Sequence, residues 1–437
     1  MRARISAATE LLHTPTGRRL VWTIVVEAII GLGILAAGMV LSRKMETHDR
    51  GVTAALLLWP QLIASIGVLG LDLSATHFSA DPRHRRDAPA TALATALPLG
   101  LASAVVYAAL IPVIFAGDHL GLFPLVVAVL SPVNVALMIG QGALQGRLNF
   151  RAFNLARTFM APLYAVLLGA FAAAHHLTPK TAAASYLVST AWTFCLTAWL
   201  LHRTGGLGRI SGGLRRTLVR YGVVAHWGRL SAQHIGVDQV IVGISLSKDD
   251  LGVFATAVIL LSAPRLLTTG AGLVLFPTAS SEHHQGRPPL LRSPMIASLA
   301  LNALVAVVLA AAAGPLVHHL FSAKYADAVT VLRIMLIGEV VRAGAQMLGE
   351  VLRGSGHHGL PGIVQAFDWV AFIAIVTAGS AIGGLHGAAV GVVIVNFLTA
   401  GLMVGLAMRA GTLHHILGYR EEPHLPHVGV RGPKTPT

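Results

Sequence analysis

Long apolar stretches alternate with short polar segments along almost the whole chain. A run of roughly 20 apolar residues is long enough to cross a bilayer as a helix. The runs are continuously apolar rather than alternating, which favours helices over the strands of a barrel. The pattern predicts an all-α polytopic membrane protein with about 12 transmembrane helices, near residues 20–41, 52–79, 91–116, 121–145, 155–174, 181–202, 219–246, 251–277, 295–314, 327–352, 360–382 and 385–409.

The composition supports this interpretation. Of the 437 residues, 54% are hydrophobic and only 11% are charged, whereas a soluble domain carries roughly 25% charged residues. Such a chain cannot cover a soluble surface, which excludes soluble enzymes and soluble binding modules. The first apolar run, from Leu20, is longer than the core of a signal peptide, and we expect it to be retained as a membrane helix. The single cysteine, Cys195, allows no intramolecular disulfide and no thiolate metal site.

The formal net charge of +14 is spread unevenly over the connections. If the N-terminus is cytoplasmic, the connections on that side and the two ends hold 22 of the 32 Lys and Arg residues. The opposite connections hold 6, and 4 lie within the predicted spans. This asymmetry follows the positive-inside rule and predicts a multi-pass plasma or inner membrane protein with both termini in the cytoplasm. The basic charge is then a topology signal, and no nucleic-acid partner is expected.

The two halves of the chain resemble each other. Gly51-Val52 in the first half matches Gly252-Val253 in the second, and the segment from Leu144 matches the segment from Leu352. The offsets are 201 and 208 residues, which predicts a parallel repeat of two six-helix lobes around a central cavity, as in transporters. The expected organisation is a cytoplasmic segment over 1–19, an N-lobe over 20–202, a Gly- and Arg-rich linker over 203–218, a C-lobe over 219–409 and a cytoplasmic tail over 410–437.

Ionisable side chains within the predicted spans mark the candidate site, because such groups are costly in lipid and face protein or water. Polar stripes on several helices predict a wet cavity between the lobes. The alternative is private pairing between helices, for which Glu339 and Arg342 have the i,i+3 spacing. A carboxyl at membrane depth can carry a proton, and the candidates for ion coupling are Glu27, Asp72, Asp238, Glu339, Glu350 and Asp368.

Arg265 is the sharpest substrate-binding candidate. It lies near the middle of the predicted span 251–277, where its side chain cannot easily reach either surface. Pro264 before it is expected to kink the helix and free a carbonyl. A buried guanidinium needs an anionic partner, either Asp238 or Glu27 on another helix or a substrate phosphate. The further substrate-binding candidates are Arg229, Arg342 and Gln346.

Short motifs resemble a known family. The run SKDDLGVFATA from Ser247 is similar to the hairpin between the seventh and eighth helices of polysaccharide and oligosaccharide flippases. LFPTAS from Leu275 resembles the end of their eighth helix, and DRG at Asp49 and GVLGL at Gly67 resemble the corresponding parts of the first half. These flippases belong to the multidrug/oligosaccharidyl-lipid/polysaccharide (MOP) exporter superfamily. The resemblance covers residues 20–410 and implies that a cavity arginine, here Arg265, holds the pyrophosphate of an undecaprenyl-linked sugar.

The predicted function is to flip a lipid-linked oligosaccharide or polysaccharide precursor from the inner to the outer leaflet by alternating access. The implied partners are the pyrophosphate-linked glycan, membrane lipids and proteins of envelope-glycan biosynthesis. A drug/cation antiporter of the same superfamily, a membrane-embedded sugar polymerase or ligase, and a transport-inactive scaffold stay open as alternatives. A polymerase or ligase should carry a large outer loop, and the predicted outer loops are short, so no enzyme activity is expected. We expect no cofactor and no metal site, because the chain has neither a Walker-type loop nor a metal-ligand pattern around its His-His pairs.

The charge asymmetry makes the topology testable. Reporter fusions at Arg209 and in the tail beyond residue 410 should both report the cytoplasm, and a fusion at Lys248 should report the opposite side. An extracytoplasmic tail would contradict the orientation.

Overall fold

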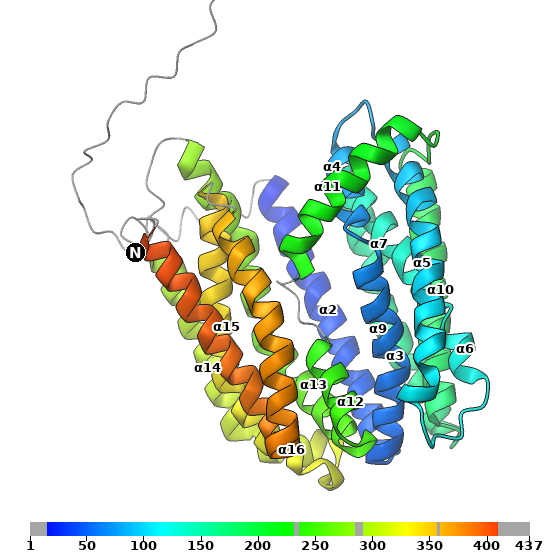
Figure 1. The fold of residues 1–437 in the computed structure, drawn as a ribbon, viewed down its shortest axis with the longest axis vertical. Coiled ribbons are helices and arrows are strands. Elements are labelled where there is room, and N and C mark those ends of the chain that lie inside the picture. The colour runs from blue at the N-terminus through cyan, green and yellow to red at the C-terminus, as the bar shows by residue number, and fades with distance from the viewer. Residues whose placement is uncertain (1–14, 231–235, 285–291, 356–358, 410–437) are drawn as a thin grey trace, which may run out of the picture.

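The computed structural model describes residues 15–230, 236–284, 292–355 and 359–409, which form helices with short connections and contain no strand (Figure 1). The first half forms α2 (Pro15–Lys44), α3 (Thr47–Gly67), α4 (Leu71–Ala80), α5 (Asp87–Ile114), α6 (Phe123–Val127), α7 (Leu130–Gly146), α8 (Phe150–Thr158), α9 (Met160–Ala173) and α10 (Pro179–Arg203). The second half forms α11 (Gly212–Leu230), α12 (Val237–Ser245), α13 (Lys248–His284), α14 (Arg292–Leu316), η1 (Val317–Phe321), η2 (Ala323–Tyr325), α15 (Asp327–Gly354) and α16 (Gly359–Arg409).

The predicted class of all-α polytopic membrane protein is confirmed. Within the described ranges, eight helical segments are long and apolar enough to cross a membrane, and the bent pair α3–α4 would make a ninth. Helix α16 is counted once, although its backbone turns back at Gly383 and Gly384. At Gly384 φ is 56°, a value that glycine adopts far more readily than other residues. The count of about 12 spans stays a prediction.

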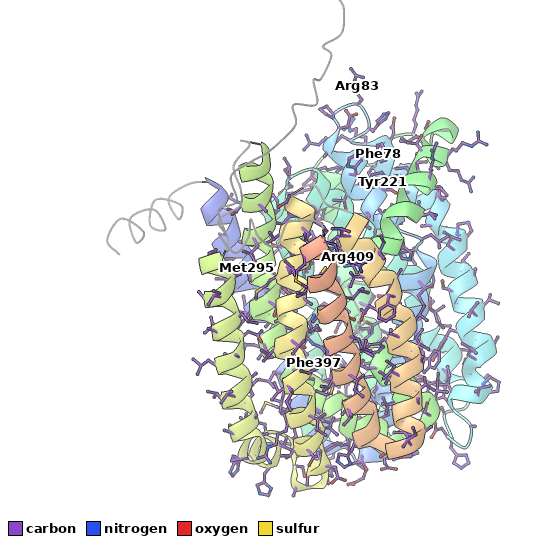
Figure 2. The ribbon with its side chains drawn as sticks, turned by 60° about the vertical axis from the view of Figure 1, so that its left-hand side comes forward. Phe78, Arg83, Tyr221, Met295, Phe397 and Arg409 are labelled. Carbon is purple, nitrogen blue, oxygen red and sulfur yellow. The ribbon has the colours of Figure 1, made fainter. Side chains whose placement is uncertain are left out.

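Large apolar side chains cover the outside of the bundle. Phe397, on the second arm of α16, lies on this outer face (Figure 2) and is 52% exposed. Val370 on the first arm is 72% exposed. Apolar side chains at this density would be unfavourable in water, and they fit contact with lipid tails.

The ends of the helices reproduce the offsets that the sequence repeat predicts. Helix α3 begins at Thr47 and α13 at Lys248, 201 residues apart. Helix α7 ends at Gly146 and α15 at Gly354, 208 residues apart. In Figure 1 the helices of the first half stand on the right and α13–α16 on the left, with α2 between them. The division into an N-lobe over 20–202 and a C-lobe over 219–409 stays a prediction.

The two lobes meet where the N-terminal turns of α3 and α13 cross. A Cβ added to Gly51 would lie 1.7 Å from the carbonyl oxygen of Lys248, and one added to Gly252 would lie 2.2 Å from that of Thr47. The contact is reciprocal, because each glycine faces the first residue of the other helix. Two backbones can approach this closely only without side chains between them.

Polar contacts between the lobes surround this crossing. The ammonium of Lys324 lies 3.1 Å from Glu46 Oε1, and the hydroxyl of Thr47 donates a hydrogen bond to Asp249. His48 Nδ1 lies 3.7 Å from a carboxylate oxygen of the same Asp249. These contacts join the first turn of α3 and the residue before it to the second half of the chain.

Helix α11 packs mainly against the first half of the chain, with a smaller contact to α16. It begins at Gly212, inside the range 203–218 expected as a linker, and lies beside α4 (Figure 1). The hydroxyl of Ser74 donates to the Leu218 carbonyl at 2.7 Å, and the rings of His77 and Tyr221 stack with centroids 4.6 Å apart. Phe78 meets the same Tyr221 ring edge-on (Figure 2). Helix α12 packs instead against α13 and α16.

A buried arginine ties three connections together at one end of the N-lobe. Arg147 is 5% exposed. Its guanidinium donates to the carbonyls of Leu201 at 3.2 Å, Gly206 at 2.7 Å and Arg85 at 3.2 Å. Burial lowers the pKa of the Arg147 guanidinium, and the charge of Arg85 lowers it further. Three basic connections that the charge pattern assigns to one side therefore lie together.

The close contact at the crossing predicts that adding one methyl group to Gly51 destabilises the protein. Gly51→Ala should lower the apparent melting temperature in detergent, because the methyl would collide with the Lys248 carbonyl; overpacking of this kind costs about 1–3 kcal/mol. Gly169→Ala in α9 is the matched control, since nothing lies within 4 Å of the added carbon. The control should melt at or above the wild-type temperature. Equal melting temperatures for the two variants would contradict a tight crossing.

Candidate functional site

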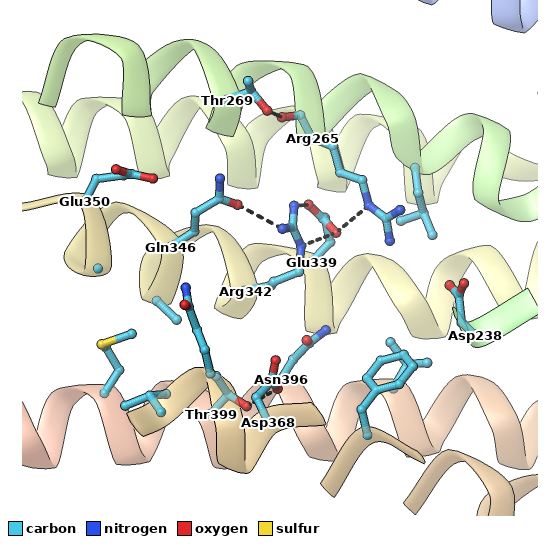
Figure 3. Close-up of a pocket in the computed structure, with 18 of the residues that line it drawn as sticks. Asp238, Arg265, Thr269, Glu339, Arg342, Gln346, Glu350, Asp368, Asn396 and Thr399 are labelled. Atoms are coloured by element: carbon cyan, nitrogen blue, oxygen red, sulfur yellow. Dashed lines mark hydrogen bonds and ion pairs between the residues drawn. The ribbon is translucent and has the colours of Figure 1, made fainter. Parts of the chain in front are cut away.

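A cavity of about 210 Å³ lies in the second half of the chain, between α12, α13, α15 and α16 (Figure 3). Sequence analysis placed the cavity between the lobes, whereas every residue that lines this one comes from the second half. Its charged lining consists of three arginines and four carboxylates, which are Arg265, Arg342, Arg353, Asp238, Glu339, Glu350 and Asp368.

Glu339 is the anionic centre of this cavity. It lies mid-way along α15 and its side chain is only 2% exposed, so its charge must be balanced by neighbouring cations. Arg342, one turn further on, donates from Nη2 to Glu339 Oε1 at 2.5 Å and from Nε to Oε2 at 3.0 Å. Arg265 on α13 donates from Nε to the same Oε2 at 3.2 Å. One carboxylate thus holds two guanidiniums, and the triad keeps one net positive charge.

The partner of Arg265 differs from the expected one. The expected carboxylate partner was Asp238 or Glu27. In the structure the carboxylate beside Arg265 is that of Glu339. Arg265 is 29% and Arg342 is 25% exposed, so both guanidiniums border the cavity. The two terminal nitrogens of Arg265 make no hydrogen bond to any residue that the structure describes. They remain available to an anion in the cavity.

The turn of α13 that carries Arg265 is held from behind by α14. The Pro264 carbonyl accepts hydrogen bonds from Asn302 Nδ2 at 2.9 Å and from Thr268 Oγ1 at 3.2 Å. Asn302 is fully buried, and its Nδ2 also donates to Thr268 Oγ1 at 3.0 Å. The proline removes the hydrogen bond to the Leu260 carbonyl four residues earlier, whereas Asn302 and Thr268 bind the carbonyl of Pro264 itself. The backbone position of Arg265 is therefore fixed by a buried polar cluster.

The remaining polar groups of α15 continue the stripe that the sequence predicted. Gln346 Oε1 accepts from Arg342 Nη1 at 2.9 Å (Figure 3). Glu350 Oε1 lies 2.5 Å from Arg353 Nη2. The sequence left two alternatives open for these side chains, pairing with a neighbour or lining a cavity. In the structure they do both. Each of these side chains contacts a neighbour and also borders the cavity.

The structure brings together four of the six carboxylates proposed for ion coupling. Asp238, Glu339, Glu350 and Asp368 line the cavity. Glu27 lies elsewhere, with its Oε1 2.8 Å from Arg157 Nη1 on α8, and Asp72 is buried in α4 of the first half. Among the substrate-binding candidates, Arg265, Arg342 and Gln346 line the cavity. Arg229 lies in α11, and its side chain falls outside the described part of the structure.

The sequence identified only Asp368 of the wall formed by α16 and missed its uncharged polar residues. Gln365, Asn396 and Thr399 line the cavity, and the Thr399 hydroxyl donates to Asp368 Oδ1. The signal was weak, because each residue is a single uncharged polar group in an apolar run. The i,i+3 spacings of 365 with 368 and of 396 with 399 place each pair on one helix face, and this could have identified them.

The fold is that of transporters of the MOP superfamily. An inward-facing multidrug resistance MATE family transporter of that superfamily superposes with a TM-score of 0.70 at 17% identity, over 91% of this chain and 100% of the other. An outward-facing structure gives 0.60 at 19% identity, over 92% and 98%. A MOP superfamily transporter from Pyrococcus furiosus, whose reversed binding-pocket polarity is taken to suggest a different function, gives 0.59 at 18% identity, over 93% and 98%.

The family is defined by the sequence match. The model of the family described as polysaccharide biosynthesis protein matches residues 40–330, about two-thirds of the chain. The chain therefore belongs to this family, and it is a multi-pass membrane protein with the MOP superfamily fold. No protein of curated function matches it.

Loss of the shared carboxylate should be costly. Glu339→Gln leaves two guanidiniums without their common anion, and we expect destabilisation of about 1–3 kcal/mol, below the 3–5 kcal/mol of a fully buried pair because the arginines are partly exposed. Glu350→Gln is the matched control, since Glu350 is 21% exposed and pairs with one arginine near the end of the helix. Thermal unfolding in detergent compares them, and equal losses would contradict the central role of Glu339.

Proposed function

We propose that this protein flips a lipid-linked oligosaccharide or polysaccharide precursor from the inner to the outer leaflet of the plasma or inner membrane. Membership of the polysaccharide biosynthesis family supports the class of substrate. The observation that carries the proposal is the arginine wall, which we define as Arg265, Glu339 and Arg342. It presents free guanidinium nitrogens and one net positive charge inside a membrane-embedded cavity.

The chemistry of this wall suits a phosphate or pyrophosphate group. A guanidinium binds phosphate oxygens through two charge-assisted hydrogen bonds, and the attraction is stronger in a cavity of low dielectric than in water. Glu339 orients Arg265 through Nε and leaves the terminal nitrogens for the ligand. The headgroup would then pass through the protein while the lipid tail stays in the bilayer.

The direction of passage follows from the predicted topology. With both termini in the cytoplasm, the crossing of Gly51 and Gly252 faces the outside and closes that end. The substrate headgroup would enter from the cytoplasmic end, and separation of the α3 and α13 N-terminal turns would release it outside. The proposal is transport rather than sugar polymerisation or ligation. The ion-coupling role of the six carboxylates stays a prediction.

A drug/cation antiporter is the second candidate. The observation that favours it is the charge of the cavity lining, in which four carboxylates face three arginines. A cationic drug would bind the carboxylates, and its binding would not depend on Arg265. Loss of this arginine should therefore impair transport of a glycan lipid and leave transport of a cation unchanged.

Reconstitution in liposomes tests the proposal. Arg265→Ala should lower the rate of flipping of an undecaprenyl-pyrophosphoryl glycan by roughly 10- to 100-fold, the value of one charge-assisted interaction, and Arg265→Lys should be impaired less. Arg333→Ala is the matched control, because the Arg333 guanidinium lies outside the cavity and donates to the Ala310 carbonyl.

Three outcomes separate the candidates. A well-expressed, thermally stable Arg265→Ala protein that flips the glycan lipid at the wild-type rate would refute the assignment. Cation efflux that is driven by an ion gradient and is insensitive to Arg265→Ala would favour the antiporter. A variant that no longer folds is identified by its melting curve, and the lysine variant then decides.

A further inference from the structure

The two arms of α16 form one continuous wall of the cavity. They turn back at Gly383 and Gly384 and then run side by side in close contact. A Cβ on Gly379 would lie 2.3 Å from the Gly387 carbonyl oxygen, and one on Gly387 would lie 2.0 Å from that of Gly379. Such close backbone contact sets the register of the arms. The register places Asp368 on the first arm opposite Thr399 on the second.

The chemistry of this α16 wall differs from that of the arginine wall. Its polar groups are two amides, a hydroxyl and one carboxylate, from Gln365, Asn396, Thr399 and Asp368. Together they can donate and accept hydrogen bonds while carrying one negative charge. A phosphate would be repelled from the α16 wall and attracted to the opposite one.

Asn396 presents an unused amide to the cavity. The residue is 5% exposed and lines the cavity, yet its amide makes no hydrogen bond to any described residue. Gly338 on α15 leaves room for it, since a Cβ there would lie 2.9 Å from Asn396 Nδ2. Its amide atoms are not enclosed by other side chains and open onto the cavity, where they can both donate and accept hydrogen bonds. A bound group that both donates and accepts hydrogen bonds would satisfy it.

Figure 3 shows the two walls on opposite sides of the cavity. Arg265, Glu339 and Arg342 lie along one side, and Asp368, Asn396 and Thr399 along the other. A ligand that touches both needs an anionic part and a neutral part rich in hydroxyl or amide groups. A sugar phosphate has these two parts joined by a single bond.

We propose that the α16 wall binds the sugar residue nearest the phosphate, while the arginine wall binds the phosphate. This inference rests on the proposed function and adds to it a site for the sugar. Hydroxyl and acetamido groups of the sugar donate to Asp368 and exchange hydrogen bonds with the amide of Asn396. The α16 wall thereby selects a glycosylated lipid over the bare lipid pyrophosphate.

Binding to the purified protein in lipid nanodiscs tests this division. The probes are undecaprenyl pyrophosphate and the same lipid carrying a hexose or an acetamidohexose. Wild-type protein should bind at least one glycosylated lipid more tightly than the bare lipid. Asn396→Leu and Thr399→Val should each weaken binding of that lipid by about 3- to 10-fold, the value of one or two neutral hydrogen bonds, and leave the bare lipid unchanged.

Thr193→Val is the matched control. Thr193 is a buried threonine of α10 that does not line the cavity, and its hydroxyl donates to the Ser189 carbonyl. It should change neither affinity. Arg265→Ala should weaken binding of the bare and the glycosylated lipids alike.

The outcomes distinguish this inference from the function on which it rests. Equal wild-type affinities for the bare lipid and both glycosylated lipids would overturn the sugar site and leave the flippase proposal standing. Loss of bare-lipid binding in Asn396→Leu would also overturn it, because the residue would then act on the fold or on the phosphate. Failure of wild-type protein to bind any of the three lipids would reject the proposed function itself.

Discussion

The reciprocal contact of Gly51 and Gly252 is the constraint on which the arrangement of the two lobes depends. Because neither residue has a side chain, the N-terminal turns of α3 and α13 touch through their backbones, and the lobes close together at this end. Arg265 lies 13 residues further along α13, about 20 Å at 1.5 Å per residue. The crossing therefore holds the principal arginine at a set depth.

A charged side chain at that depth needs a partner of opposite charge. The second half of the chain supplies the partners from its own helices. Glu339 is almost fully buried and is balanced by Arg342 on its own helix and by Arg265 on another. The buried Asn302 holds the turn at Pro264. A guanidinium positioned by its Nε and by its backbone loses little conformational freedom when a ligand takes the remaining nitrogens. The pairing and the proposed binding therefore support each other.

The two halves share helix boundaries but not chemistry. The repeat is visible in the starts of α3 and α13 and in the ends of α7 and α15, yet every residue that lines the charged cavity comes from the second half. The candidates Glu27 and Asp72 in the first half lie apart from it. Helix α11 adds a further asymmetry, because it follows the connection between the halves and packs mainly on α4, with smaller contacts to α5 and α16. Such differences arise from packing between distant segments, which the repeat in sequence does not encode visibly.

The sequence by itself determined the class of fold, the approximate course of most helices and the repeat offsets, and it singled out Arg265, which the structure places in the cavity. Each is a local property, because hydrophobic run length and the cost of charge in lipid act on single segments. Only the tertiary structure decided that Glu339 is the partner of Arg265, and that Asn396 and Thr399 face the arginines across a cavity. Such pairings depend on which faces of separate helices meet. The sequence of an apolar helix does not specify which of its faces packs against a given neighbour, because this depends on how the helices are arranged.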